Sequence, residues 1–90
     1  MYAKGQKKGT VRFAVKPADA KEVALAGSFN GWKPEPMKKQ KDGKFSVVVD
    51  LPSGTYEYKF VVDGRWIVDP DTNTWAMNPY GSFNSIAQID

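Results

Sequence analysis

The sequence predicts an all-β protein built as an antiparallel β-sandwich, and three observations lead to this prediction. Short segments alternate apolar and polar residues, which is typical of strands that bury one face. Turn-forming residues separate these segments at short and regular intervals. No segment has the apolar period of a helix, and a chain of 90 residues is long enough for a sandwich of about seven short strands.

The first half of the chain contains the clearest alternation. Residues 11–16 alternate apolar and polar side chains until Pro17 ends the run. Residues 23–26 form a second, apolar strand, and the proline-containing segment that follows is expected to be irregular. Asp42-Gly43 then predicts a hairpin turn that leads into a strand over residues 45–51.

The next strand, over residues 55–62, sets a row of aromatic side chains on one face and Lys59 on the other. Asp63-Gly64 predicts a two-residue type I′ hairpin into a strand at residues 65–68. If the aromatic face fills the core, this hairpin folds Trp66 back beside Lys59 on the solvent side of the sheet.

The rest of the chain is expected to be a loop and a closing strand. Residues 71–81 are rich in Asp, Asn, Pro and Gly and predict a loop, in which we expect Trp75 to anchor the loop over the sheet edge. Residues 82–89 predict the last strand. We expect residues 1–8 to be a flexible N-terminal tail and residues 9–90 to form a single domain.

The residue types that support catalysis are scarce. The sequence has no His and no Cys, which excludes a Ser-His-Asp triad, a Cys-His pair, the usual zinc sites and disulfides. Asp69 and Asp71 are the closest pair of carboxylates, and we interpret them as turn residues because Asp commonly bonds its own backbone. We therefore expect a protein that is not an enzyme and that needs no metal and no cofactor.

The net charge of +3 comes from lysines that cluster near the start of the chain and around one turn. Such clusters could attract nucleic acid, but they are short, and we interpret them as solvated side chains. No apolar run approaches the ~20 residues of a membrane span, and the first residues lack the apolar core of a signal peptide. We expect no nucleic-acid partner, no membrane partner and a cytoplasmic location.

Two tryptophans, Trp32 and Trp66, lie in turn-rich segments and not inside apolar runs. From their positions alone, each could be a buried core residue or an exposed platform for a ligand. Sugar rings have apolar C–H faces that stack on such planes, and the Lys59 ammonium beside Trp66 could bond hydroxyl groups. This combination suggests a carbohydrate-binding module.

Three ordered motifs carry a resemblance to a known family. They are Val-Ala-Leu-Ala-Gly-Ser-Phe-Asn-Gly-Trp at residues 23–32, Leu-Pro-Ser-Gly-Thr-Tyr-Glu-Tyr-Lys-Phe-Val-Val-Asp-Gly-Arg-Trp-Ile-Val-Asp-Pro at residues 51–70, and Gly-Ser-Phe-Asn-Ser-Ile at residues 81–86. The chain resembles carbohydrate-binding module family 48, which includes the glycogen-binding modules of AMP-activated protein kinase β subunits. The resemblance implies an immunoglobulin-like, early-set sandwich that binds α-1,4-glucans such as glycogen, starch, maltooligosaccharides and cyclodextrin.

The resemblance also implies roles for particular residues. Trp32 and Trp66 would be the stacking platforms, and Lys59 would bond hydroxyls. Asn84 aligns with a family residue that bonds sugar hydroxyls, and Ser82 stands where the family has Thr.

A further position departs from the kinase module: Tyr80 takes the place of a Leu that reaches into the curve of the glucan, and it could stack on a sugar instead.

The alternative function is a protein-docking domain, held by a catalytic domain or a kinase partner, that binds no sugar of its own. A basic β domain that stacks nucleic-acid bases is a third hypothesis.

Overall fold

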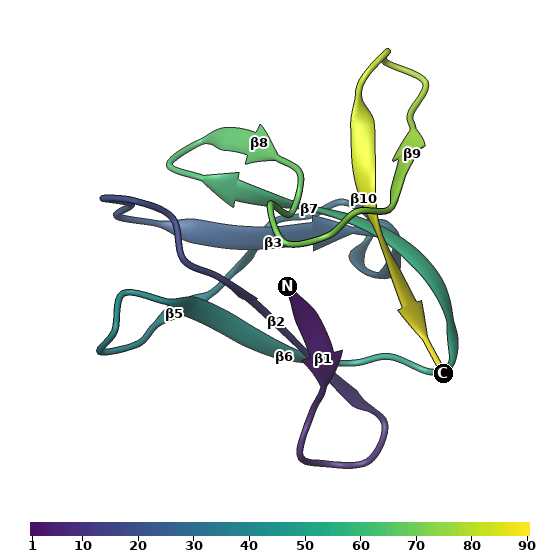
Figure 1. Cartoon of the computed structure of the whole chain (residues 1–90), viewed down its shortest axis with the longest axis horizontal. Helices are drawn as coiled ribbons and strands as arrows, with labels where there is room; N and C mark the ends of the chain where they lie inside the picture. Colours follow the sequence, from purple (N-terminus) through teal and green to yellow (C-terminus); the bar gives the residue numbers. More distant parts are fainter.

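The computed structural model describes residues 1–90 as two antiparallel sheets and one short 3-10 helix, η1, at Ser28–Asn30. The two sheets face each other as layers (Figure 1), so the predicted antiparallel β-sandwich is confirmed. The first sheet has the order β1 (Tyr2–Lys4), β2 (Thr10–Val15), β6 (Phe45–Asp50), β5 (Lys38–Lys39). The second has the order β4 (Glu35–Pro36), β3 (Val23–Gly27), β7 (Gly54–Val62), β10 (Phe83–Ile89), β9 (Trp75–Met77), and β8 (Arg65–Ile67) pairs with β7.

The core lies between the layers and is built from the inward faces that the alternation predicted. Phe13 of β2, Leu25 of β3, and Tyr58 and Phe60 of β7 are completely buried. The rings of Phe13 and Tyr58 meet edge to face with their centroids 4.9 Å apart, an arrangement that aromatic pairs favour. Burial of these faces fixes the register of the sheets, because a slip by one residue would turn each inward side chain outward.

Strand β7 is the centre of the second sheet and pairs with β3, β10 and β8. Its side chains alternate as predicted, so that Tyr58 and Phe60 point into the core while Glu57, Lys59 and Val61 occupy the outer face. The outer face of β7 therefore presents polar groups in the middle of a rigid sheet.

The hairpin between β7 and β8 is the predicted two-residue turn. Asp63 and Gly64 have φ values of 48° and 85°, as a type I′ turn requires. The Asp63 carboxylate accepts hydrogen bonds from the backbone N–H groups of Lys21 at 3.1 Å and Glu22 at 2.8 Å. These bonds, chiefly the one from Glu22, lower the pKa of Asp63 and tie the hairpin to the segment before β3.

The first residues differ from the flexible tail that the sequence led us to expect for residues 1–8. Residues 2–4 form β1, in which Tyr2 lies opposite Phe13. The Tyr2 ring contacts the ring of Tyr58 at a centroid distance of 6.2 Å, and its hydroxyl accepts a hydrogen bond from the Gln88 N–H at 3.1 Å. Backbone pairing with β2 and packing of the Tyr2 ring together hold this segment against the sheet. The domain boundary at residue 9 stays a prediction.

The segment 71–81 also differs from expectation, since it contains the strand β9 within the predicted loop. Trp75 belongs to this strand and is 52% exposed, so it does not cover the sheet edge as we expected. Backbone pairing with β10 stabilises β9, and local sequence does not report such pairing.

Asp69 has a structural role that goes beyond the predicted turn. It accepts the expected local hydrogen bond from the Asp71 N–H at 2.9 Å, but its side chain is completely buried. The Tyr58 hydroxyl donates to the Asp69 carboxylate at 2.5 Å, and the Asp69 N–H donates to the Ser85 hydroxyl at 2.7 Å. The amino group of Met1 also contacts this carboxylate. Burial raises the pKa of the Tyr58 phenol above its usual range, and the hydrogen bond to Asp69 raises it further.

Candidate binding groove

A groove of about 540 Å³ opens on the outer face of the second sheet. Its floor is formed by outward-facing residues of β7 and β10, and its walls come from the turn after η1, from β8 and from the turn between β9 and β10. Figure 1 shows the β7–β8 and β9–β10 hairpins projecting from this sheet on the side away from the first sheet. The groove contains five of the six residues that the sequence predicted for a site, Trp32, Lys59, Trp66, Tyr80 and Asn84.

Trp32 is placed by the tight turn that ends β3. Its N–H donates to the Gly27 carbonyl at 2.9 Å, and the Asn30 side-chain oxygen accepts from the Gly27 N–H at 3.0 Å. Gly31 and Trp32 have φ values of 67° and 62°, so both are left-handed. This conformation suits Gly31, but it is costly for a tryptophan, and such strain is common where a side chain is held for a function.

Gly27 is required at the start of this turn for a different reason. A Cβ atom built at this position would lie 2.7 Å from the Glu57 carbonyl oxygen and would overlap the Phe29 ring. The absence of a side chain lets the turn approach β7 closely. The Glu57 N–H then donates to the Ser28 hydroxyl at 3.1 Å, which fixes the turn to the groove floor.

Trp66 and Lys59 are neighbours across the β7–β8 ladder, as the hairpin predicted. Trp66 lies opposite Val61, two residues beyond Lys59 on the same outer face, and is 47% exposed. The Lys59 ammonium donates to the Ser82 hydroxyl at 3.0 Å. Ser82 itself is not among the residues that line the groove, but it orients a side chain that does. A lysine ammonium has three donor protons, so Lys59 retains the capacity to bond a ligand.

Asn84 differs from the other predicted residues because it is buried, with 6% of its surface exposed. Its amide nitrogen donates to the Glu57 carboxylate at 3.0 Å, and its oxygen accepts from the Asn78 amide at 3.1 Å. One amide proton and one oxygen lone pair remain for a ligand. Asn84 is therefore held rigidly in the groove floor by two partners.

Tyr80 lies at the tip of the β9–β10 turn and is 92% exposed. Asn78 organises this turn, because its side-chain oxygen accepts from the N–H groups of Tyr80 at 3.0 Å and Ser82 at 3.1 Å. The Tyr80 ring thus extends freely above the groove from a well-defined backbone.

Five of the ten residues that line the groove were not predicted from the sequence, and Glu57 and Asn78 are the two of them that bond the Asn84 side chain. Asn84 bonds to both, so it joins β7 to the β9–β10 turn through consecutive hydrogen bonds. The sequence carried a signal for Glu57, which precedes Lys59 by two positions and so shares its face. Asn78 gave no comparable signal, because asparagines are common in loops for local reasons alone.

The chemistry of the groove combines aromatic planes with directional polar groups. It can hold a neutral ligand that has apolar faces and hydroxyl edges, and Glu57 is its single carboxylate. The structure contains no group of three or more potential metal ligands. It also contains no helix of sufficient length and apolarity to cross a membrane.

The chain is similar to known proteins over most of its length. The family model for the glycogen recognition site of AMP-activated protein kinase matches residues 11–90. The 5'-AMP-activated protein kinase subunit beta-1 of Sus scrofa is 41% identical over 69 residues, which cover 77% of this chain and 55% of that protein. The protein PTST homolog 2, chloroplastic, of Arabidopsis thaliana is 53% identical over 55 residues, which cover 60% of this chain and 10% of that protein.

Solved structures show the same fold within much larger chains. The maltogenic amylase from S. marinus matches with a TM-score of 0.79 and 26% identity, over 100% of this chain and 16% of that one. The putative alpha amylase from Salmonella typhimurium matches with a TM-score of 0.71 and 25% identity, over 97% of this chain and 14% of that one. The chain thus spans only part of each of these proteins. Because the family model covers nearly the whole sequence, the chain belongs to the family of glycogen recognition domains of AMP-activated protein kinase.

Proposed function

We propose that this domain binds α-1,4-glucans, and that it does so in the groove without catalysing a reaction. The observation that carries the proposal is that Trp32, Lys59 and Trp66, which come from three separate segments, line one groove. Membership of the glycogen recognition family supports the choice of ligand.

The proposed mechanism is stacking of glucose rings on the two tryptophans. Trp66 is about half exposed before any ligand binds, so its indole face is available for contact. Removal of ~100 Å² of apolar surface from water on each tryptophan would contribute ~2.5 kcal/mol apiece. Losses of translational and rotational freedom offset a good part of this gain. We expect a Kd on the order of micromolar to millimolar.

The polar residues of the groove would form hydrogen bonds with the sugar hydroxyls. Lys59 would donate from its free ammonium protons, and Asn84 from the amide proton that Glu57 does not take. Ser82 would act by orienting Lys59, and Tyr80 would cover the outer side of the bound glucan. Because hydrogen bonds already hold the floor residues in place, little ordering is needed on binding.

A non-catalytic role is supported by the acid groups of the groove. Hydrolysis of a glycosidic bond commonly needs two carboxylates on opposite sides of that bond. The groove offers Glu57 alone, and its carboxylate already accepts a hydrogen bond from Asn84.

Partners and location are further parts of the proposal. The relatives include a subunit named for a protein kinase, and the solved structures include amylases, so we propose that a kinase or a glucan-active catalytic domain could hold this domain in a larger assembly. A cytoplasmic location stays a prediction from the sequence, and the Arabidopsis relative is named as chloroplastic.

The proposal is tested by Trp66→Ala in a calorimetric titration with maltoheptaose. Because Trp66 is exposed and lies outside the buried core cluster, the variant should stay folded while its affinity falls by roughly tenfold or more. Circular dichroism and thermal melting establish the folded state. A folded variant with the affinity of the wild type would refute the site, and an unfolded one would show that Trp66 belongs to the core.

A further inference from the structure

A second hollow, of about 660 Å³, adjoins the groove, and the two share Lys59 and Trp66. Trp75 of β9 and Phe83 of β10 form its far side, and Ile67 and Val68 contribute apolar surface where β8 ends. Trp66 therefore stands between two recesses and contributes to the lining of each.

Trp75 and Phe83 are presented to solvent by the register of the β9–β10 ribbon. Trp75 lies opposite Ser85, and Phe83 lies opposite Met77, which puts Trp75 and Phe83 diagonally across the same face. They are 52% and 50% exposed, and neither belongs to the core cluster. Exposed aromatic rings that cluster in one hollow indicate a binding surface. Half of the surface of each ring stays in water, so the two rings contribute little burial to the stability of the fold.

The second hollow has two polar side chains, Lys59, which also lines the groove, and Ser82, which lines the second hollow alone. The Lys59 ammonium donates to the Ser82 hydroxyl at 3.0 Å. The walls therefore combine indole and phenyl planes with a cation and a hydroxyl, which is the combination that the groove itself offers to a sugar.

We infer that this second hollow is an additional subsite for a glucose ring of an α-glucan, with Trp75 as its stacking platform. The inference rests on the proposed function of the groove. Continuity favours a glucan over a peptide, because a ligand stacked on Trp66 already contacts the wall of the second hollow. The ring in this subsite would come from an α-1,6 branch of the bound glucan or from a second chain beside it.

The test compares Trp75→Ala with the wild type in calorimetric titrations of β-cyclodextrin, 6-O-α-maltosyl-β-cyclodextrin and maltoheptaose. If the subsite takes a branch, the wild type binds the branched ring about fivefold more tightly than the plain ring, and Trp75→Ala loses this preference. If it takes a second chain, the wild type binds two maltoheptaose molecules and Trp75→Ala binds one. In either case Trp75→Ala should bind plain β-cyclodextrin within about twofold of the wild type.

Two further variants keep the test decisive. Phe83→Thr removes the second ring of the hollow but keeps a strand-forming residue, and it should weaken the same ligands as Trp75→Ala. Val48→Ala is the matched control, because Val48 is a 55% exposed apolar residue on β6 of the other sheet.

The outcomes separate this inference from the proposed function. Wild-type affinities and stoichiometries in both Trp75→Ala and Phe83→Thr would overturn the second subsite. If Trp66→Ala then still lost binding, the proposed function of the groove would be supported without the second subsite. Failure of the wild type to bind any of the three glucans would overturn both.

Discussion

Trp32 shows at the scale of one residue how the fold and the site conflict. Its left-handed backbone, with φ of 62°, costs a residue with a side chain about 1–2 kcal/mol, and glycine avoids that cost. We therefore expect Trp32→Gly to be more stable than Trp32→Ala by about 1 kcal/mol in urea unfolding, although glycine ordinarily destabilises a chain relative to alanine. Both variants should lose glucan affinity. Equal stabilities, or a more stable alanine variant, would show that the turn relaxes and that Trp32 is not held under strain.

Tyr58 donates a hydrogen bond from its hydroxyl to the buried Asp69 carboxylate, and this bond leads to a second prediction for a single residue. Tyr58→Phe removes this donor and should lower the unfolding free energy by about 1–3 kcal/mol. Tyr56→Phe is the matched control, since the exposed Tyr56 hydroxyl donates to the Pro52 carbonyl. A loss no larger than that of the control would mean that Asp69 does not depend on Tyr58.

The same phenol makes stability depend on alkaline pH. Its pKa is raised in the folded protein, so above about pH 10 the unfolded chain releases the Tyr58 proton while the folded chain keeps it. The stability that the Tyr58 phenol contributes is fully present below about pH 10 and falls as the pH rises above it. Tyr58→Phe should show a shallower alkaline decline in thermal melting than the wild type.

At the scale of elements, the β7–β8 hairpin that carries Trp66 depends on Asp63. Backbone N–H groups lower the pKa of this carboxylate in the folded state. The carboxylate therefore contributes to the stability of the fold above about pH 4, and this contribution is lost as the pH falls through the folded pKa. Asp63→Asn keeps a residue that tolerates the turn but removes the titrating group. We expect the variant to be less stable than the wild type at neutral pH, with the difference shrinking in acid.

Thermal melting between neutral and acid pH measures this prediction. Asp50→Asn, at an exposed position of β6, is the control and should not reproduce the convergence. A stability difference between Asp63→Asn and the wild type that stays constant into acid would contradict the role of the carboxylate.

The elements also show where sequence reasoning succeeds. Alternation predicted β2 and β7, the Asp42-Gly43 turn predicted the start of β6, and the Asp63-Gly64 pair predicted the β7–β8 hairpin. Alternation and turn chemistry can both be read from short local segments. Strands β1, β4 and β9 were not predicted, and β4 lies in the proline-containing segment that we expected to be irregular. Each has only two or three residues and depends on a neighbouring strand for its pairing. Pairing partners distant in sequence leave no local pattern.

The site was partly predictable for the same reason. Trp32 and Trp66 stand out in the sequence because aromatic residues in turns are conspicuous, and Lys59 shares a predicted face. The hydrogen bond from Asn84 to Glu57 depends on the approach of β10 to β7, so no pattern within one segment could report it. The bond from Asn78 to Asn84 depends on how the β9–β10 turn folds, which the sequence of the turn did not reveal.

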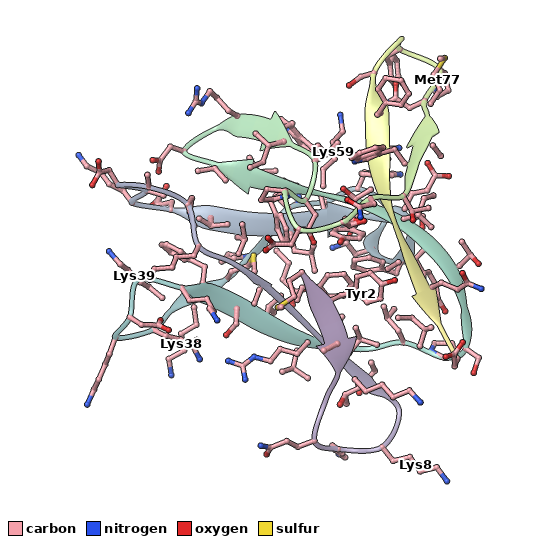
Figure 2. All side chains as sticks on the ribbon, viewed as in Figure 1. Tyr2, Lys8, Lys38, Lys39, Lys59 and Met77 are labelled. Atoms are coloured by element: carbon pink, nitrogen blue, oxygen red, sulfur yellow. The ribbon has the colours of Figure 1, made fainter.

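At the scale of the whole molecule, the lysine clusters lie away from the groove. Figure 2 shows Lys8, Lys38 and Lys39 on parts of the molecule away from Lys59 and Met77, which lie on the groove side. A neutral glucan should therefore bind almost equally at about 50 mM and about 500 mM salt, whereas a phosphate backbone would bind much more weakly at the higher concentration. A steep loss of affinity with salt would favour a nucleic-acid ligand over the glucan.

We propose that an α-glucan binds against the tryptophans of the groove, and a fluorescence titration with β-cyclodextrin measures this binding. This ring presents the curvature of an α-1,4-glucan, and cellohexaose, a β-1,4-linked chain of the same sugar, is the control. We predict a saturable change in tryptophan fluorescence with β-cyclodextrin alone, which Trp66→Ala abolishes. No change up to about millimolar β-cyclodextrin, or an equal response to cellohexaose, would contradict the claim.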